Sequence, residues 1–197
     1  MPDRCSRRGL GRFALAAALC ASLPAALSVE ASQRFAGRGE IEVAFTPRDD
    51  AESLLVGVIG QARRSLHVQA YAFTNRRIAD AMVKAHRRGV DVQVLADERM
   101  NRREKGNALP RLLAAGVPVA LETKYNAAHN KVLIVDADGP GCAVVTGSFN
   151  FTWSAQNRNS ENVLILRGHC EVARAYRDNW LQHRRDAVAV TALPLKR

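Results

Sequence analysis

The feature of this chain that most constrains its fold is the uninterrupted apolar run from Val132 to Val135, set between polar segments. A strand exposed on one face alternates apolar and polar residues, whereas a strand buried on both faces is apolar throughout. The run therefore predicts a central strand of a sheet that is covered on both faces. We expect a layered α/β/α sandwich around a mixed β-sheet.

Segments with strand and helix patterns alternate along the rest of the chain. Helices are expected at 49–64, from Asn75 to Gly89, at 108–115 and at 170–185, and strands at 41–45, 65–73, 90–95, 117–121, 131–135, 142–146 and 162–166. The early alternation indicates parallel pairs, and the later strands follow one another quickly, so the sheet should be mixed. Residues 32–197 suffice for one domain and are too few for two.

The first 31 residues have the layout of a secretory signal peptide. Four arginines precede an uncharged stretch from 13 to 27, and small residues surround a cleavage position before Ser32. The stretch is too short for stable membrane insertion, and Arg7 with Arg8 leaves Sec export and twin-arginine export both open. We therefore expect residues 1–31 to be removed and the domain of residues 32–197 to be periplasmic or secreted.

The charge balance favours a polyanionic partner. Removing the first 31 residues takes away four arginines and two acids, so the formal net charge falls from +10 to +8. A basic surplus attracts phosphates whatever the sequence of a nucleic acid.

Two cysteines, Cys142 and Cys170, follow residue 31. In an oxidising compartment they could form a disulfide, or they could remain two buried thiols, and the sequence leaves both open. No C-x2-C or H-x3-H spacing is present, so no metal site is expected.

Four polar residues flank the apolar run where one phosphate could meet them all. His129 and Lys131 lie two residues apart, so on a strand their side chains point to the same face, about 7 Å apart along the chain. Ser148 and Asn150 repeat this spacing on the next segment. An imidazole, an ammonium, a hydroxyl and a carboxamide together suit phosphodiester chemistry.

The pattern H-x-K-x4-D from His129 to Asp136, followed by G-S-x-N at 147–150, resembles the phospholipase D superfamily, and its small bacterial endonucleases in particular. The similarity extends to Y-A-F-T at 71–74 and N-S-E-N at 159–162 and covers the chain from 41 to 180. It implies no metal and no cofactor. It also implies phosphate binding by Ser148 and Asn150 and catalytic roles for His129, Lys131, Asp136 and Glu161.

The resemblance also implies a mechanism that needs two histidines. One neutral imidazole attacks phosphorus to form a covalent phosphohistidine, and a second, protonated imidazole delivers a proton to the departing oxygen. Only His129 stands in an H-x-K pattern. We therefore expect a homodimer in which each chain presents His129 to one shared site, with His67 the first in-chain alternative.

The two acids of the catalytic set differ in how well they fit a strand. Asp136 lies seven residues after His129 with opposite parity, about 23 Å away on an unbroken strand. Strand geometry therefore favours a supporting role at the strand end, although the motif includes Asp136. Glu161 is the better candidate to hold the second nitrogen of the imidazole, with a surface acid as the alternative.

Three further features leave alternatives open. Residues 137–146 are more than the family usually has between the motif acid and the Gly-Ser, and the turn formers at 138–141 indicate a longer hairpin tip. A basic loop could contact nucleic acid or be merely solvated. Phe151 and Trp153 could stack on bases, but core packing is favoured. The basic loop that could contact nucleic acid contains Arg99, Arg102, Arg103 and Lys105.

Together these features favour a metal-independent, nonspecific endonuclease that cleaves DNA, and they leave open whether it also cleaves RNA. A phospholipase D-type phosphatidyl hydrolase is the enzymatic alternative, because relatives use the same machinery on phospholipids. The charge and the lack of an apolar docking run after residue 31 favour nucleic acid. A noncatalytic nucleic-acid-binding protein would need only the basic charge, and the intact His129, Lys131, Ser148 and Asn150 argue against it.

Overall fold

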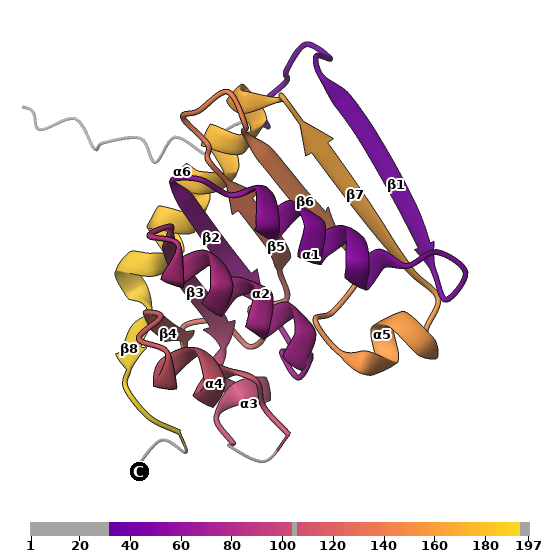
Figure 1. Cartoon of the computed structure of the whole chain (residues 1–197). Coiled ribbons are helices and arrows are strands. Elements are labelled where there is room, and N and C mark those ends of the chain that lie inside the picture. The colour runs from indigo at the N-terminus through magenta and orange to yellow at the C-terminus, as the bar shows by residue number, and fades with distance from the viewer. Residues whose placement is uncertain (1–31, 104–105, 194–197) are drawn as a thin grey trace, which may run out of the picture. The chain divides into compact units, whose positions relative to one another are not determined.

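The computed structural model describes residues 32–103 and 106–193, so the expected signal peptide lies outside the described residues. Within these residues, eight strands form one sheet in the order β1-β7-β6-β5-β2-β3-β4-β8 (Figure 1). The pairs β2–β3 and β3–β4 are parallel and the others are antiparallel. The predicted mixed sheet is confirmed, and β5 with its apolar run lies between β2 and β6.

The strands are β1 (Glu40–Thr46), β2 (Ser65–Ala70), β3 (Asp91–Asp97), β4 (Val119–Glu122), β5 (Lys131–Val135), β6 (Ala143–Gly147), β7 (Glu161–Arg167) and β8 (Val188–Val190). The helices are α1 (Ala51–Gln61), α2 (Arg76–Arg87), α3 (Glu98–Asn101), α4 (Leu109–Ala114), α5 (Trp153–Asn157) and α6 (Cys170–Asp186). The sequence pattern did not predict α3, α5 and β8, because elements this short show no clear periodicity.

Local signals begin and end the long helices. The Asn75 side chain accepts a hydrogen bond of 3.0 Å from the Ile78 N–H at the start of α2, as predicted for a cap. The Asp50 carboxylate does the same for Ser53 at the start of α1, at 2.9 Å. Gly89 follows α2 with a φ of 90°, a conformation that favours glycine and ends the helix.

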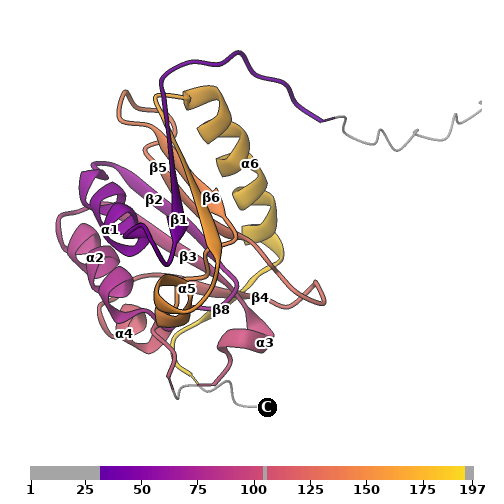
Figure 2. The same cartoon turned by 90° about the vertical axis from the view of Figure 1, so that its right-hand side faces the viewer.

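Helices cover both faces of the sheet, as Figure 2 shows, with α1 and α2 on one face and α6 on the other. The face under α1 and α2 is packed with residues such as Leu55, Ile78 and Leu133, and the face under α6 with Val132, Ile134 and Trp180. Neighbouring residues of β5 thus enter two different cores, which is why its run is apolar throughout. In the described part of the chain, no helix has the length and apolar character needed to cross a bilayer.

At the β1 edge of the sheet, the face that α6 packs against elsewhere is not covered by a helix. Ile41, Val43 and Phe45 alternate along the edge strand β1 and are 60%, 56% and 51% exposed. Ile41 pairs with Leu166 of β7, which packs against the core under α6, so these residues share that face of the sheet. An edge strand with a continuous apolar row is a surface that another protein chain can cover.

A disulfide joins Cys142, just before β6, to Cys170, the first residue of α6, with a Cα–Cα distance of 5.4 Å. The sequence had left this pairing open against two buried thiols. The bond fastens the start of α6 to the sheet that the helix covers.

Candidate active site

The ends of four strands meet at one end of the sheet. Because β5 is antiparallel to both β2 and β6, its start lies beside the ends of those two strands. The start of β7 joins them, since Gly147 at the end of β6 pairs with Val163. This end lies at the bottom of the sheet in Figure 1. The strand bounds place five residues at or next to these neighbouring strand ends, namely His129, Lys131, Ser148, Asn150 and Glu161.

His129 and Lys131 lie against the ring of Tyr71. The His129 and Tyr71 ring centroids are 4.3 Å apart, and Lys131 Nζ lies 4.8 Å from the Tyr71 centroid. Lys131 Nζ also donates a hydrogen bond of 2.6 Å to the His129 carbonyl. The His129 side chain is exposed, whereas Lys131 is only 6% exposed. An exposed imidazole and a largely buried ammonium therefore lie against the same Tyr71 ring.

The charge of Lys131 is perturbed by its surroundings. Burial lowers the pKa of Lys131, and the Glu161 carboxylate offsets part of this effect. Glu161 therefore acts on Lys131 through its charge. In the described part of the chain its hydrogen-bond partner is Asn159, at 2.8 Å, and no hydrogen bond joins it to His129 of the same chain. The expected contact between Glu161 and the imidazole is not made here.

Ser148 is oriented by the start of β7. Its Oγ accepts a hydrogen bond of 3.0 Å from the Asn162 N–H, which leaves the hydroxyl hydrogen free to donate to a phosphate oxygen. The Ser148 N–H in turn donates to the Asn162 carbonyl at 3.1 Å. Gly147 permits this close approach, because a Cβ there would lie 2.2 Å from the Asn162 carbonyl oxygen and the φ is 147°.

Asn150 follows Ser148 at the end of the motif and is half-buried. Its Oδ1 is buried without a hydrogen-bond partner in the described structure. The carboxamide oxygen only accepts hydrogen bonds, so a phosphate bound here would be held by the Nδ2 hydrogens of Asn150.

Asp136 does not join these residues. It follows β5 at the opposite end from His129, and its carboxylate accepts hydrogen bonds from the N–H groups of Arg63, Arg64 and Ser65 at 2.9, 2.8 and 2.8 Å. The inclusion of Asp136 among the catalytic residues is therefore wrong for this chain in any direct sense. The supporting role that strand geometry favoured fits its position, since it fastens the start of β2 to the end of β5.

Two buried polar residues that the sequence pattern did not single out, Asp97 and Asn101, hydrogen-bond the backbone on which the site residues lie. Asp97 is 1% exposed and accepts a hydrogen bond of 2.8 Å from the N–H of Ala128, the residue before His129. Asn101, also 1% exposed, donates to the Tyr71 carbonyl at 2.6 Å. The only sequence signal for these residues was their place at the end of an expected strand, and Tyr71 itself was noted only within the family motif.

The other histidines belong to different surroundings. The His67 ring is stacked on Trp180, with centroids 4.4 Å apart, and burial lowers its pKa. His67 is thus part of the core under α6 and a poor candidate for a second general acid. His183 is hydrogen-bonded to the buried Glu122 at the end of β4. Within the described residues, no three His, Cys, Asp or Glu side chains are grouped to hold a metal ion.

The two aromatic residues after the motif have different environments. Phe151 is buried and packs edge-on against Phe73, with centroids 5.5 Å apart. Trp153 is exposed, so the favoured expectation of core packing holds for Phe151 and is wrong for Trp153. In the basic segment, Arg99, Arg102 and Arg103 are exposed on and just after α3.

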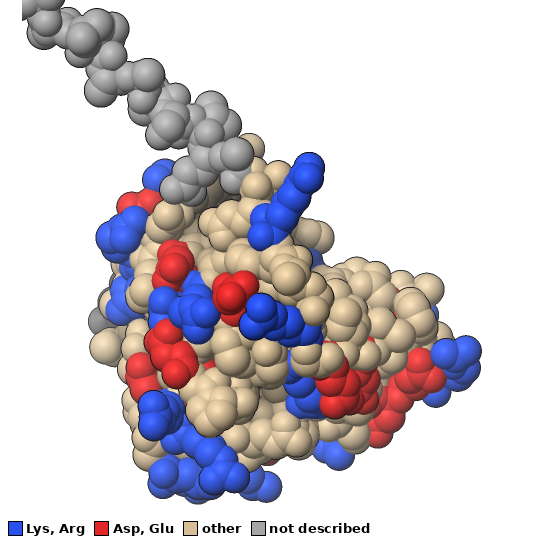
Figure 3. Space-filling view, turned by 90° about the horizontal axis from the view of Figure 1, so that it is seen from above, with Lys and Arg blue, Asp and Glu red and all other residues tan. Residues whose placement is uncertain are grey.

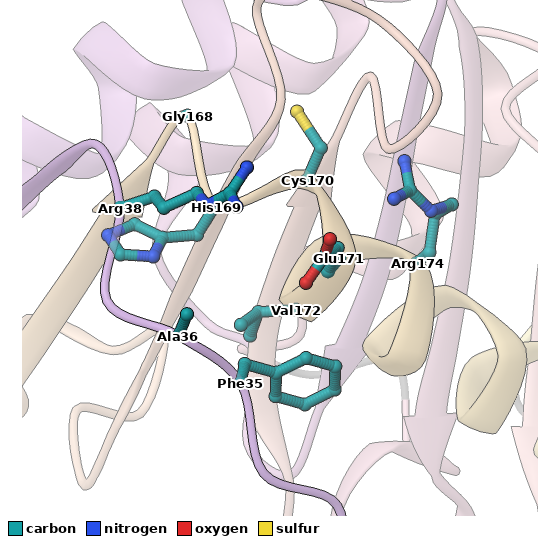
Figure 4. A pocket seen from close by; sticks show the side chains of 9 residues that line it. All are labelled: Phe35, Ala36, Arg38, Gly168, His169, Cys170, Glu171, Val172 and Arg174. Carbon is teal, nitrogen blue, oxygen red and sulfur yellow. The ribbon is translucent and has the colours of Figure 1, made fainter.

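The opposite end of the domain has a different character. There the end of β7 and the start of α6 form a hollow of about 260 Å³ whose walls carry both signs of charge, from Arg38, Arg174 and Glu171 (Figure 4). Figure 3, which looks onto that end, shows lysine and arginine interspersed with acidic residues. Neither feature offers the convergent donors found around His129.

Comparisons with known proteins agree with this geometry. The family model described as cardiolipin synthase, PLD-like domain, matches residues 55–184. A protein of Rickettsia prowazekii (strain Madrid E) named phospholipase D is 37% identical over 153 residues, which make up 78% of this chain and 72% of the relative.

Two solved structures extend the match to the fold. Nuc from Salmonella typhimurium, described as a phospholipase D family member, aligns with a TM-score of 0.73 and 31% identity over 78% of this chain and 99% of Nuc. NucT from Helicobacter pylori aligns with a TM-score of 0.65 and 26% identity over 77% of this chain and 100% of NucT. With His129, Lys131, Ser148 and Asn150 of the motif gathered at one end of the same fold, this chain belongs to the phospholipase D superfamily.

Proposed function

We propose that this protein is a metal-independent endonuclease that cleaves DNA and RNA phosphodiesters with little sequence preference. The observation that carries the proposal is the exposed His129 imidazole beside the enclosed Lys131 ammonium. An imidazole can attack phosphorus, and a nearby fixed cation stabilises the charge that develops on the nonbridging oxygens.

The reaction proceeds in two steps. A neutral His129 ring nitrogen attacks phosphorus, the bond to the leaving oxygen breaks, and a second imidazolium protonates that oxygen. Water, deprotonated by the same second imidazole, then attacks the phosphohistidine and releases His129. Lys131, Ser148 and Asn150 bind the phosphate oxygens throughout.

A homodimer supplies the second imidazole in this proposal. His129 is exposed in the single chain, as a group that must meet His129 of the partner subunit would be. The row Ile41, Val43 and Phe45 on β1 suits the interface, because its Phe45 end pairs with Asn162, the residue that holds Ser148. A symmetric interface that starts there would continue toward the shared site.

Two experiments test the dimer, one with a variant of the β1 surface and one with mixed active and inactive chains. Val43→Glu should convert the protein to an inactive monomer in sedimentation experiments, while the exposed Leu181→Glu on α6 serves as a matched control. Mixing wild-type chains with excess His129→Ala chains, with subunit exchange verified, should reduce activity beyond dilution. A fully active monomer would refute the shared site.

Nucleic acid is the substrate class that we favour. The domain of residues 32–197 carries a formal charge of +8, and Arg99, Arg102 and Arg103 are exposed where Asn101 fastens α3 to Tyr71. Lysine and arginine side chains that neutralise phosphates supply sequence-independent affinity. The names Nuc and NucT of the structural relatives support the same class.

A phosphatidyl hydrolase is the second candidate. The Rickettsia relative is named phospholipase D, and the exposed apolar row on β1 could contact lipid in place of a second chain. The charge of the domain suits anionic phospholipids as well as nucleic acid.

One experiment separates the two candidates. Purified residues 32–197 are incubated with plasmid DNA, with RNA and with labelled phosphatidylcholine and cardiolipin vesicles, each in excess EDTA and each beside His129→Ala. We expect cleavage of both nucleic acids by the wild type alone. Cleavage of lipid only would establish the second candidate, and activity that EDTA abolishes and a divalent ion restores would refute the mechanism.

Export to the periplasm or the medium is part of the proposal. The pattern of residues 1–31 and the Cys142–Cys170 disulfide both suit an oxidising compartment. A fusion of residues 1–40 to alkaline phosphatase, which is active only after export, tests it.

A further inference from the structure

Trp153 is an aromatic side chain that stands outside the hydrophobic core. It is the first residue of α5 and is 55% exposed, whereas Trp180, the other tryptophan of the chain, is 1% exposed. Tryptophan offers a large flat surface that proteins commonly use for binding, and leaving it in water forgoes the stabilisation that burial would give.

The place of α5 ties Trp153 to the active site. The helix lies in the connection between Asn150 and Glu161, at the site end of the sheet (Figure 1). Trp153 follows Asn150 by three residues, so their Cα atoms are within about 11 Å. Just after the C-terminal end of α5, the Asn159 side chain donates a hydrogen bond of 2.8 Å to Glu161.

The orientation of α5 is fixed by contacts with the body of the domain. The Thr46 hydroxyl donates to the Ala155 carbonyl at 2.7 Å. The Gln156 side chain accepts from the Glu52 N–H at 3.0 Å and donates to the Asp49 carbonyl at 2.9 Å. Ala155 is buried, so the helix turns Trp153, two residues earlier, toward solvent. The ring is therefore presented by a rigid support.

A cation accompanies the ring. The Arg158 guanidinium carbon lies 5.0 Å from the Trp153 ring centroid, in the geometry of a cation–π contact. A flat aromatic surface with an attached positive charge matches a nucleotide, whose base can stack on the ring while its phosphate meets the guanidinium.

We propose that Trp153 and Arg158 form a base-stacking subsite that holds an unpaired nucleobase next to the scissile phosphate. The inference rests on the proposed nuclease function and adds a substrate class to it, namely single-stranded or locally opened nucleic acid. A base within a closed duplex is stacked on its neighbours and must leave the stack before it can contact such a ring, which costs free energy.

Intrinsic fluorescence gives a direct test, because Trp153 is exposed and Trp180 is buried. The His129→Ala variant of residues 32–197 prevents turnover and is titrated with oligothymidylate. We expect quenching of the exposed tryptophan, loss of most of that quenching in His129→Ala/Trp153→Phe, and little quenching by an abasic oligonucleotide of equal length. The exposed Phe35, at the opposite end of the sheet, provides a control, since Phe35→Ala should leave the quenching intact.

Cleavage provides an independent readout. In the wild-type background, Trp153→Ala should lower the ratio of kcat/KM for single-stranded to that for duplex DNA on the order of tenfold, because base–aromatic stacking is lost. Trp153→Phe should retain part of the preference.

The outcomes separate this inference from the proposed function. If the wild type cleaves nucleic acid in EDTA but oligothymidylate does not quench Trp153, the subsite is wrong and the nuclease stands. A blue shift on anionic vesicles without quenching by oligothymidylate would also overturn the subsite, because the ring would then contact lipid. If the wild type cleaves no nucleic acid, both proposals fail.

Discussion

Replacing Asp136 with asparagine separates a structural role from a catalytic one. In the folded chain one carboxylate oxygen accepts the N–H groups of Arg64 and Ser65, and the other accepts that of Arg63. Asparagine keeps one acceptor oxygen but turns an N–H₂ group toward the third donor. The φ of 44° at this position is tolerated by asparagine, so backbone strain does not add to the effect.

The expected loss of stability follows from these three hydrogen bonds. One partly buried N–H left without an acceptor costs about 1–3 kcal/mol, and two hydrogen bonds that change from a charged to a neutral acceptor lose about 1 kcal/mol each. Asp136→Asn should therefore lower the free energy of unfolding by about 3–5 kcal/mol. That is a large part of the stability of a typical domain.

Urea unfolding of residues 32–197, followed by tryptophan fluorescence, measures this loss. Phosphodiesterase turnover is measured in parallel at a temperature where the variant is folded, and kcat should stay close to that of the wild type. Asp138→Asn is the matched control, because Asp138 is exposed and its ion pair with Arg177 lies at the surface. Unchanged stability together with lost turnover in Asp136→Asn would refute the structural role.

Three further predictions concern groups elsewhere in the domain. Replacing both Cys142 and Cys170 with serine should lower the free energy of unfolding by about 3–4 kcal/mol for a sequence separation of 28, seen as a lower urea midpoint, and an unchanged midpoint would contradict it. Burial lowers the pKa of Lys131, so Lys131 loses its proton at a lower pH than an ordinary lysine does. Activity that needs its charge should therefore decline on the alkaline side of the pH–rate profile, starting at that lower pH. Lys131→Arg should remove that alkaline decline from the pH–rate profile if it is active. Burial also lowers the pKa of His67, so unfolding takes up a proton, and the free energy of unfolding should fall as the pH drops below about 6.5. His67→Gln should flatten that dependence in urea titrations at several pH values.

Much of the fold was predictable because it follows from local patterns. The apolar run of β5, the cap at Asn75 and the alternation of strand and helix each depend on residues close together in the sequence. The same holds for the spacing of His129 and Lys131, since a strand fixes the relation of residues two apart. Elements of three to five residues, such as β8 and α5, were missed because so short a segment shows no period.

The sequence by itself thus determined the α/β layers, the family and the five residues gathered at one end of the sheet. Only the tertiary structure decided the role of Asp136, whose three donors lie 71 to 73 residues away, and the place of Tyr71 against His129. It also decided the pairing of the cysteines and the exposure of Trp153. These properties depend on which distant segments meet when the sheet and its covering helices pack together, and no local pattern encodes that meeting.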